Sequence, residues 1–473
     1  MDEFEVCIAG AGACGLFGAV ALASGGIRVC VLEKESSIGG FGVVEIEPEI
    51  RSVLCRFGLS RFFEDSKNVR GKVVLQRRLI EALLEAAYGA GVEIRFDAEV
   101  VDVEGFIITY GNKRSLHAPY LVGADGSESF VRRRVFETRG CVFDTLASSP
   151  GTYCVVDKTP PVKTTQRRGT WTLGPSGLVR LGFFLRPNES APEGVAAYSL
   201  KCRVASMIAL DDKAFLIGDA AHSFGSNPSV NHGIRSALNL AWKLYYAIRF
   251  EKTAPLATFE PEMRRRALSL AAARGASSWV WGKQRGRTAG LKLFGATPGA
   301  GTLFPEPYVV EENATTRHVL GRDLPMFSFH VVGLGVDPQT TITIFQTAKL
   351  LELGFRFSTV LLAGDDHHLT SHDDLSHVYH EVETTDILRQ WRRRYQNPDV
   401  VVVRPDLYVF AGVKVPDLHD LLDALLTLLH QPSFGLEEEE EDVFPAARTR
   451  TRTAAGTDSL CCMSTASSSS SCI

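Results

Sequence analysis

The chain has 473 residues, of which 45% are apolar and 22% are charged, and its formal net charge at pH 7 is −4. This length allows two to four domains with ample cores, and the composition is that of an ordinary soluble protein. The small negative charge gives no reason to expect nucleic acid or an anionic membrane as a partner. We find no signal-peptide pattern and no uncharged apolar run long enough to cross a bilayer, so we expect a cytoplasmic protein.

The cysteines and histidines give no sign of a metal or redox centre. Ten cysteines lie at positions 7, 14, 30, 55, 141, 154, 202, 461, 462 and 472. None forms a Cys-x-x-Cys pair, which argues against a disulfide framework, a zinc ribbon and a dithiol redox site. Five histidines are grouped in an acidic stretch between residues 367 and 380. We interpret this stretch as a solvated loop and expect no metal there.

A glycine-rich motif near the N-terminus follows a predicted strand. Residues 4–9 form an apolar run, and residues 10–15 read Gly-Ala-Gly-Ala-Cys-Gly. A predicted helix then leads to a second predicted strand over residues 27–32, which ends on Glu33. Strand, glycine turn, helix, strand and acid together make the dinucleotide-binding fingerprint in its required context.

Each residue of this fingerprint has a physical role. Gly10 permits the tight turn, Gly12 lets a pyrophosphate approach the backbone at the helix N-terminus, and Gly15 allows the helix to pack closely on the strand. Glu33 is placed to accept hydrogen bonds from the adenosine ribose hydroxyls. Because an acid fits a free ribose, the fingerprint predicts FAD or NAD and not NADP, without choosing between FAD and NAD.

A second motif lies far along the chain. An apolar run over residues 214–217 reads as a buried strand and ends on Gly218-Asp219, where a carboxylate follows a residue that lets the backbone turn. After a short loop, apolar residues recur at helical spacing between Ile234 and Ile248. The start of such a helix can face a bound anion or an electron-rich ring.

A third motif lies between these two, and the three together carry a resemblance. A predicted strand over residues 120–122 leads into Gly-Ala-Asp-Gly-Ser-Glu-Ser-Phe-Val-Arg at residues 123–132. The order of the glycine motif, this segment and Gly-Asp-Ala-Ala-His at residues 218–222 resembles the single-component FAD-dependent aromatic monooxygenases. These are the p-hydroxybenzoate hydroxylase and phenol hydroxylase group. The resemblance covers roughly the first 260 residues.

The resemblance implies a fold and a division into domains. The fold class is α/β, with a Rossmann-like FAD-binding domain, an inserted antiparallel substrate sheet and a thioredoxin-like C-terminal domain. For the last of these, Val-Arg-Pro-Asp at residues 403–406 resembles the closing strand–turn–strand of the phenol hydroxylases. The expected boundaries are 1–134 and 205–265 for the FAD-binding domain, 135–204 for a shortened substrate sheet, 266–315 for a helical or linker region, 316–432 for the C-terminal domain and 433–473 for a disordered tail.

The resemblance also implies which residues hold the cofactor. Glu33 would hold the adenosine ribose, and Gln76 would contact the phosphate or ribityl region of the flavin. Asp125 lies where the family holds both FAD and the pyridine nucleotide, and Asp219 would bind the ribityl chain. Asn231 begins the helix that would point at the isoalloxazine ring. The whole predicted set is Gly10, Gly12, Ala13, Gly15, Glu33, Lys34, Gly42, Gln76, Asp125, Gly126, Gly218, Asp219, Asn231 and Gly233.

The implied activity is that of an FAD-dependent monooxygenase. NADPH or NADH would reduce the flavin, and O2 would give a flavin C4a-hydroperoxide that hydroxylates a phenolic or other aromatic small molecule. The cofactor carries this chemistry, so we assign no catalytic side chain. The resemblance also makes a homodimer the assembly to consider, because family members commonly assemble through the C-terminal domain.

Three departures from the family pattern keep a second interpretation open. Residues 58–76 and 126–218 are shorter than the corresponding family segments, and the loop at residues 223–231 lacks the family's glycine pair. This loop would pass the face of the flavin where oxygen reacts. The alternative is a non-oxygenating or inactive FAD-binding flavoprotein, such as a scaffold or a flavin reductase.

Overall fold

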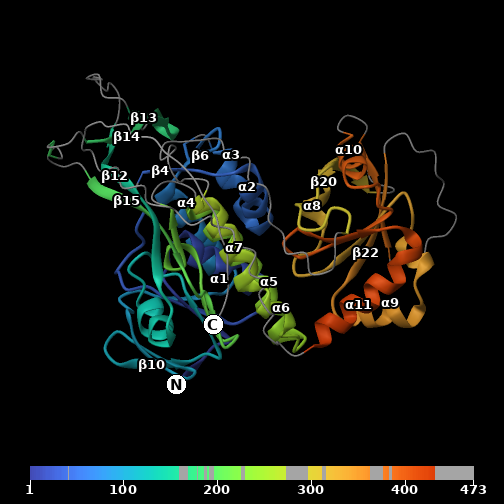
Figure 1. Cartoon of the computed structure of the whole chain (residues 1–473), viewed down its shortest axis with the longest axis horizontal. Helices are drawn as coiled ribbons and strands as arrows, with labels where there is room; N and C mark the ends of the chain where they lie inside the picture. The colour runs from blue at the N-terminus through green and yellow to red at the C-terminus, as the bar shows by residue number, and fades with distance from the viewer. Residues whose placement is uncertain are drawn as a thin grey trace, which may run out of the picture. The chain divides into compact units, whose positions relative to one another are not determined.

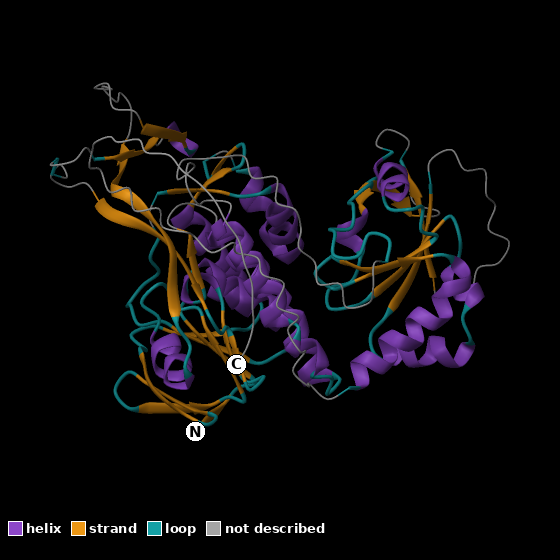
Figure 2. Ribbon diagram, in the orientation of Figure 1, coloured by secondary structure: helices purple, strands orange, loops and turns teal. Residues whose placement is uncertain are grey.

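The computed structural model of the chain is drawn in Figures 1 and 2. Residues 1–434 form one compact unit. The structure describes residues 1–40, 42–65, 67–158, 169–177, 179–185, 189–190, 196–224, 229–272, 297–311, 316–362, 376–382 and 386–431. Several predicted features lie outside the described residues: the loop at 225–228, most of the linker before 297, the histidines at 367, 368 and 372, and the tail at 433–473.

A six-stranded sheet carries the three motifs at the ends of its strands. Its order is β16-β17-β11-β2-β3-β7, and neighbouring strands are parallel except β16 with β17. The strands are β2 (Val6–Ala9), β3 (Val29–Leu32), β7 (Glu93–Arg95), β11 (Tyr120–Gly123), β16 (Ala209–Leu210) and β17 (Ala214–Leu216). The four central strands are apolar and fully buried, as expected for parallel strands covered on both faces. Because they run in parallel, the turns that follow them meet at one edge of the sheet.

Helix α5 lies at the centre of the helices around this sheet (Figure 1). It packs against α1, α2, α6 and α7. The sequence predicts one apolar face for α5, but the structure buries residues 231–244 on all sides, because neighbouring helices and residues of the C-terminal part cover them. The helices are α1 (Ala13–Ser24), α2 (Pro48–Leu54), α4 (Gln76–Gly89), α5 (Ser229–Arg249), α6 (Ala254–Ala257) and α7 (Phe259–Ala272).

Two small sheets complete the N-terminal part. Their orders are β4-β6-β5 and β1-β10-β9-β8. Helix α2 ends at Leu54, because a kinked turn over residues 55–59 places Gly58 at φ +92° before α3 (Ser60–Glu64). The strands are β1 (Asp2–Glu3), β4 (Val43–Glu45), β5 (Val69–Arg70), β6 (Val73–Leu75), β8 (Val100–Glu104), β9 (Ile107–Tyr110) and β10 (Arg114–His117).

A separate antiparallel sheet follows the order β13-β14-β12-β15-β18. Its strands are β12 (Phe143–Lys158), β13 (Gly169–Leu173), β14 (Val179–Phe184), β15 (Ala196–Ala205) and β18 (His222–Phe224). This sheet was expected within residues 135–204. Strand β18 extends it beyond that range, directly after the Gly218-Asp219 turn, so this turn leads straight into the antiparallel sheet.

A seven-stranded mixed sheet forms the C-terminal part, with the order β20-β19-β23-β22-β21-β24-β25. Strands β21, β22 and β23 are parallel, and the other pairs are antiparallel. The strands are β19 (Tyr308–Glu311), β20 (His318–Val319), β21 (His330–Leu334), β22 (Arg356–Leu361), β23 (Ser376–Glu381), β24 (Val400–Val403) and β25 (Val409–Val413). The helices beside it are α8 (Leu320–Asp323), α9 (Ile344–Glu352), α10 (Ile387–Arg394) and α11 (Leu418–His430).

One prediction is wrong within this sheet. His377 and His380 were interpreted as part of a solvated loop, but both belong to β23, which pairs with β22 and β19. Their side chains are exposed, whereas Val378 and Tyr379 between them are buried. Burial of the two apolar residues favours the strand. The polar histidines on either side made the segment look like a loop in the sequence. The fold class as a whole is mixed α/β, as predicted. Of the described helices, none is both long and apolar enough to pass through a bilayer.

Candidate functional site

The turn after β2 has a shape that only glycine permits. Gly10 has φ of +105°, and a Cβ there would lie 2.5 Å from the carbonyl oxygen of Ala124. A Cβ on Gly15 would lie 2.1 Å from the carbonyl oxygen of Gly10. Helix α1 therefore packs against the turn with no room for a side chain, as the fingerprint predicts.

Gly12, by contrast, faces open space. It is exposed, it is the N-cap of α1, and a Cβ there would meet no atom within 4 Å. No side chain caps this helix, which begins with Ala13, so the N–H groups of its first turn have no partner within the helix. Free N–H groups and the positive end of a helix dipole favour a phosphate at this position.

Glu33 connects the end of β3 to the same turn. Its Oε2 accepts a hydrogen bond from the N–H of Ala11 at 2.7 Å, and its Oε1 accepts one from the N–H of Glu35 at 3.0 Å. The side chain is half-buried, and a carboxylate has about four acceptor positions, so capacity for ribose hydroxyls remains. The neighbouring Lys34 is exposed and forms an ion pair with Glu35 at 3.7 Å.

Asp125 has an acceptor atom that the protein does not use. Its Oδ2 accepts a hydrogen bond from the N–H of Val131 at 3.0 Å, whereas its Oδ1 is buried without a hydrogen-bond partner in the described part of the chain. Leaving such an atom unsatisfied costs about 1–3 kcal/mol, which a ligand donor would recover. Gly126 follows at φ +81°, and a Cβ there would meet nothing within 4 Å, so open space adjoins Asp125.

Arg132 is a residue of the site that the predicted set lacks. Its buried guanidinium donates to the carbonyl oxygens of Ala220 at 2.9 Å and Ser127 at 2.7 Å, and it lies 3.9 Å from the ring centre of Phe143. It thereby connects the turn after β11 to the turn after β17. The sequence signal that pointed to it was its place at the end of the third motif.

The turn after β17 lies beside α1. Gly218 has φ of +59°, and a Cβ there would lie 3.1 Å from Sγ of Cys14. Burial raises the pKa of the Asp219 carboxyl, because the charged form loses contact with water, and a hydrogen bond with Ser229 opposes part of this rise. The Asp219 side chain nevertheless reaches the surface. It is a partly desolvated carboxylate with an open side, which suits binding of hydroxyl groups.

Cys14 fills the contact between α1 and α5, and the sequence did not single it out. A Cβ on Gly233 would lie 2.2 Å from Sγ of Cys14 and 3.1 Å from Cα of Gly218. Glycine is therefore required where the start of α5 crosses α1. Burial raises the pKa of the Cys14 thiol to about 12, and the Asp219 charge adds to this rise. The thiol is neutral and acts as a packing group.

Asn231 already uses its amide to hold the protein backbone. Its Oδ1 accepts a hydrogen bond from the N–H of Glu47 at 3.0 Å, and its Nδ2 donates to the carbonyl oxygen of Glu45 at 2.8 Å. These bonds connect the first turn of α5 to β4 and to the start of α2. The structure thus shows Asn231 placing the helix, and its direct contact with a flavin stays a prediction.

Gln76 and Gly42 lie together at the other end of β4 and β6. The N–H of Gln76, the first residue of α4, donates to the carbonyl oxygen of Gly42 at 3.0 Å. Gly42 has φ of +72° and immediately precedes β4, which also carries Glu45, the acceptor of Asn231. The two predicted contacts are therefore connected to the start of α5 through β4.

Two buried histidines lie next to the predicted contacts in the sequence. The ring centres of His222 and His232 are 4.4 Å apart, and both side chains are buried. Phe224 stacks on His222 at 4.9 Å. Burial lowers the pKa of His222 to about 3 and that of His232 well below its ordinary value, so both rings are neutral at pH 7.

These observations fit a bound dinucleotide. The turns after β2, β11 and β17 adjoin at one sheet edge, and they offer an open helix end at Gly12, an unused acceptor on Asp125 and an accessible carboxylate on Asp219. Glu33 directly follows β3, the strand beside β2. Among the described residues, no group of three or more His, Cys, Asp or Glu side chains is placed to hold a metal ion.

Two family models match the chain. A model described as an FAD binding domain matches residues 55–166, and one described as the HcaD C-terminal domain matches residues 301–428. The first match contains Gln76 and Asp125. The second contains the C-terminal mixed sheet.

Curated relatives match over most of the chain. The 3-(3-hydroxy-phenyl)propionate/3-hydroxycinnamic acid hydroxylase of Klebsiella pneumoniae (strain 342) is 24% identical over 537 residues, which cover 90% of this chain and 94% of the relative. The protein of the same name from Paraburkholderia xenovorans (strain LB400) is 31% identical over 220 residues, or 38% of this chain and 32% of the relative.

Solved structures share the fold. Aklavinone-11 hydroxylase, crystallised with FAD and aklavinone, has a TM-score of 0.67 and 19% identity, with 91% of this chain and 98% of that chain covered. CabE, an aromatic hydroxylase from angucycline biosynthesis, has a TM-score of 0.65 and 19% identity, with 87% and 96% covered. The antiparallel sheet looked shortened from the sequence. The chain as a whole nevertheless matches nearly the full length of both solved structures.

Proposed function

We propose that this protein, a relative of the FAD-dependent aromatic hydroxylases, uses NADPH or NADH and O2 to hydroxylate a phenolic or other aromatic small molecule. The predicted resemblance, FAD as the cofactor and the class of FAD-dependent monooxygenase are confirmed. The observation that carries the proposal is the meeting of Gly12, Asp125 and Asp219 at the carboxyl ends of three neighbouring parallel strands.

Five of the predicted contacts have a stated role in this proposal. The first turn of α1 after Gly12 binds the pyrophosphate, Glu33 binds the adenosine ribose, and Gln76 and Asp219 bind the phosphate and ribityl region. Oδ1 of Asp125 accepts a hydrogen bond from the bound nucleotide. When bound, FAD supplies the redox chemistry that activates O2. The protein binds and orients the cofactor, keeps water from it and places the aromatic ring beside it.

The finer structural expectations belong to the same proposal. The six-stranded parallel sheet with its glycine turn supports a Rossmann-like FAD-binding domain over residues 1–134 and 205–265. The C-terminal mixed sheet would be thioredoxin-like, within residues 316–432. A homodimer and a cytoplasmic location are proposed from the family resemblance and from the sequence.

The substrate class follows from the relatives and from the antiparallel sheet. The relatives are named as hydroxylases of 3-(3-hydroxyphenyl)propionate and 3-hydroxycinnamic acid, so a phenol with a carboxylate side chain is the first compound to test. The rings of Tyr153 and Phe184 pack 5.0 Å apart on this sheet, and Phe183 is buried, so Phe184 is the better candidate to meet a substrate.

A direct experiment tests the activity. The purified chain is reconstituted with FAD, and oxidation of NADPH and NADH is followed with 3-(3-hydroxyphenyl)propionate and with a panel of other phenols. We expect one compound to stimulate NAD(P)H oxidation and O2 uptake, and to yield a product with one additional oxygen atom. Bound FAD without any substrate-stimulated oxidation would contradict the proposal and favour a non-oxygenating flavoprotein.

A further inference from the structure

A carboxylate from the C-terminal part of the chain holds the middle of α5. Asp406 lies in the turn between β24 and β25, and its Oδ2 accepts hydrogen bonds from Nδ2 of Asn239 at 3.0 Å and from Nε1 of Trp242 at 3.2 Å. All three residues are buried, with relative exposures of 4% for Asp406, 1% for Asn239 and 3% for Trp242. A buried hydrogen bond fixes direction as well as distance, so Asp406 fixes the position of this helix.

Other buried charges fix Asp406 itself. Nε of Arg404 donates to Asp406 at 2.9 Å, and its two terminal nitrogens each donate to a carboxylate oxygen of Glu262 on α7 at 2.9 Å. Glu262 also accepts a hydrogen bond from Asn239 at 2.8 Å and pairs with Nζ of Lys243 at 3.4 Å. We call Arg404, Asp406, Glu262 and Lys243 the charge cluster. Its two positive and two negative groups balance.

Such a cluster contributes orientation more than stability. Removing charges from water costs free energy that their mutual attraction only roughly offsets, and packed apolar side chains would fill the same space without this cost. Asn239 and Trp242 lie one helical turn apart and meet the same oxygen atom. A rotation or a shift of α5 along its axis would therefore break at least one of these bonds.

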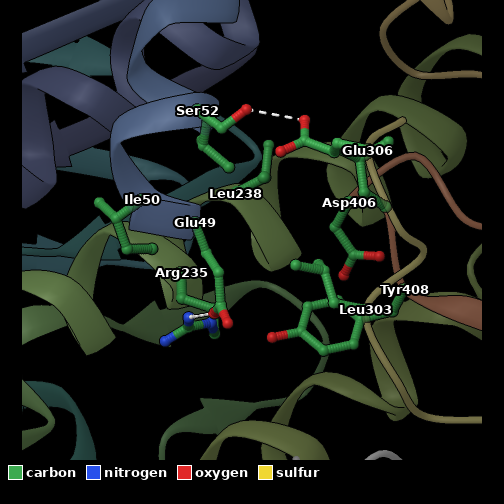
Figure 3. A pocket seen from close by; sticks show the side chains of 11 residues that line it. Glu49, Ile50, Ser52, Arg235, Leu238, Leu303, Glu306, Asp406 and Tyr408 are labelled. Carbon is green, nitrogen blue, oxygen red and sulfur yellow. Dashed lines mark hydrogen bonds and ion pairs between the residues drawn. The ribbon is translucent and has the colours of Figure 1, made fainter. Parts of the chain in front are cut away.

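The junction around Asp406 leaves little room for movement. Figure 3 shows Leu238 of α5 beside Asp406 and Tyr408, with α2 completing the wall of a small cavity. The cavity measures about 20 Å³, which is space for about one water molecule. Ser52 of α2 donates to Glu306 at 2.7 Å across the same junction.

The start of α5 is packed just as closely at the proposed flavin site. Gly233 has no room for a Cβ beside Cys14 and Gly218, and Asn231 holds the backbone of residues 45–47. Asn239 lies eight residues after Asn231, or about 12 Å along the helix axis. A packed helix moves as a unit, so a displacement at Asn239 reaches the Gly218-Asp219 turn.

We propose that Asp406 is a positioning residue of the flavin site, which acts through Asn239 and Trp242 on the place of α5 and of the turn that it packs against. The proposal rests on the flavin site proposed above. In this proposal the turn between β24 and β25 of the C-terminal mixed sheet helps to position the residues that bind the cofactor.

The test compares FAD binding by variants of the full chain. Asp406→Ala removes both acceptor bonds, and Trp242→Phe removes only the Nε1 donor and keeps an aromatic ring. FAD affinity is measured by flavin fluorescence, and the absorption spectrum and midpoint potential of the bound flavin are recorded at a temperature where circular dichroism shows every variant folded. We expect Asp406→Ala to weaken FAD binding by about tenfold or more and Trp242→Phe by about two- to fivefold, both with a changed flavin spectrum.

Asp399→Ala is the matched control. Asp399 also lies in the C-terminal part, and its side chain accepts from Arg392 at 2.8 Å and from Lys414 at 3.1 Å, residues of the same part. We expect this variant to bind FAD within about twofold of the unaltered chain even where it melts at a lower temperature.

A double-mutant cycle separates positioning from general destabilisation. Asn239→Ala and Asp406→Ala remove the same bond, so their effects on FAD affinity should be less than additive. Additive effects would overturn the inference, as would FAD affinity and flavin spectra unchanged in both Asp406→Ala and Trp242→Phe. If Asp406→Ala does not fold, Trp242→Phe decides. A folded, unaltered chain that binds no FAD would overturn the proposed function together with this inference, and that result precedes any comparison of variants.

Discussion

The start and the middle of α5 are built in opposite ways. At its start, Gly218 and the main-chain atoms of residues 45–47 shape the surroundings, and the neighbouring turns at Gly12 and Asp125 leave open space and an unused acceptor. In its middle, the charge cluster pairs side chains from three distant segments and leaves almost no space. The comparison teaches that a site shaped by backbone geometry leaves hydrogen-bonding groups available for a ligand. In a site made of paired side chains, these groups already bond to one another.

The largest expected loss of unfolding free energy comes from the charge cluster. Arg404→Met leaves Glu262 and Asp406 buried without their main partner, and we expect a loss of about 3–5 kcal/mol in urea unfolding. Arg392→Met is the control, because its ion pair with Asp399 is partly exposed and should contribute about 1 kcal/mol or less. Similar losses for the two variants would break the contrast between a closed cluster and an ordinary surface pair.

The next effect concerns the glycine turn. Gly15→Ala places a methyl group 2.1 Å from the carbonyl oxygen of Gly10, and backbone cannot yield as a side chain does. We expect a loss of about 1–3 kcal/mol, together with lost FAD binding. Gly89→Ala in α4 is the control, since its Cβ would meet nothing within 4 Å, and it should leave stability unchanged or slightly raised. Equal behaviour of the two glycines would contradict the close packing of α1.

A smaller effect depends on pH and tests the buried histidines. The pKa of His222 is about 3 in the folded chain and about 6.5 unfolded, so the unfolded chain binds an additional proton between these values. The stability that this residue contributes is complete above pH 6.5 and is lost as the pH falls towards 3. We expect His222→Gln to reduce the slope of unfolding free energy against pH by about 1.4 kcal/mol per unit between pH 4.5 and 6. An unchanged slope in urea titrations would show that His222 is not buried as a neutral ring. His380→Gln serves as the control, because the side chain of His380 is exposed.

The smallest effect on stability should accompany a large effect on the cofactor. Gly12→Ala adds a methyl group in open space, so the unfolding free energy without FAD should change by less than about 1 kcal/mol. The same methyl group would occupy the approach of the pyrophosphate, and we expect the FAD dissociation constant to rise by about tenfold or more. Flavin fluorescence measures the second quantity. Unchanged FAD affinity would remove the assignment of this turn to the cofactor.

The same contrast explains what could be predicted from the sequence. Gly10, Gly12 and Gly15 act through backbone geometry over a few residues, so their spacing alone indicated a strand, a turn and a helix. Arg404 and Glu262 are 142 positions apart, and no local pattern joins them. Lys243 reads as an ordinary charged residue of a helix, although the structure buries it completely.

Asn231 shows the limit within a well-predicted motif. Its position at the start of the helix after Asp219 was predicted, and the structure places it there. The partners of its amide, the backbone of Glu45 and Glu47, depend on how β4 packs against α5, which is a tertiary contact without a sequence signature. Motifs of this kind predict where a polar side chain lies better than they predict which atom it will bind.

The charge cluster also decides which parts of such a chain can be exchanged by recombination. In a hybrid that takes its C-terminal mixed sheet from another protein, Glu262 and Asn239 would keep their partners only if an arginine and an aspartate stand at the positions of Arg404 and Asp406. The unit to exchange is therefore the mixed sheet together with α5 and α7, although residues 273–296 separate these helices from the sheet in the sequence.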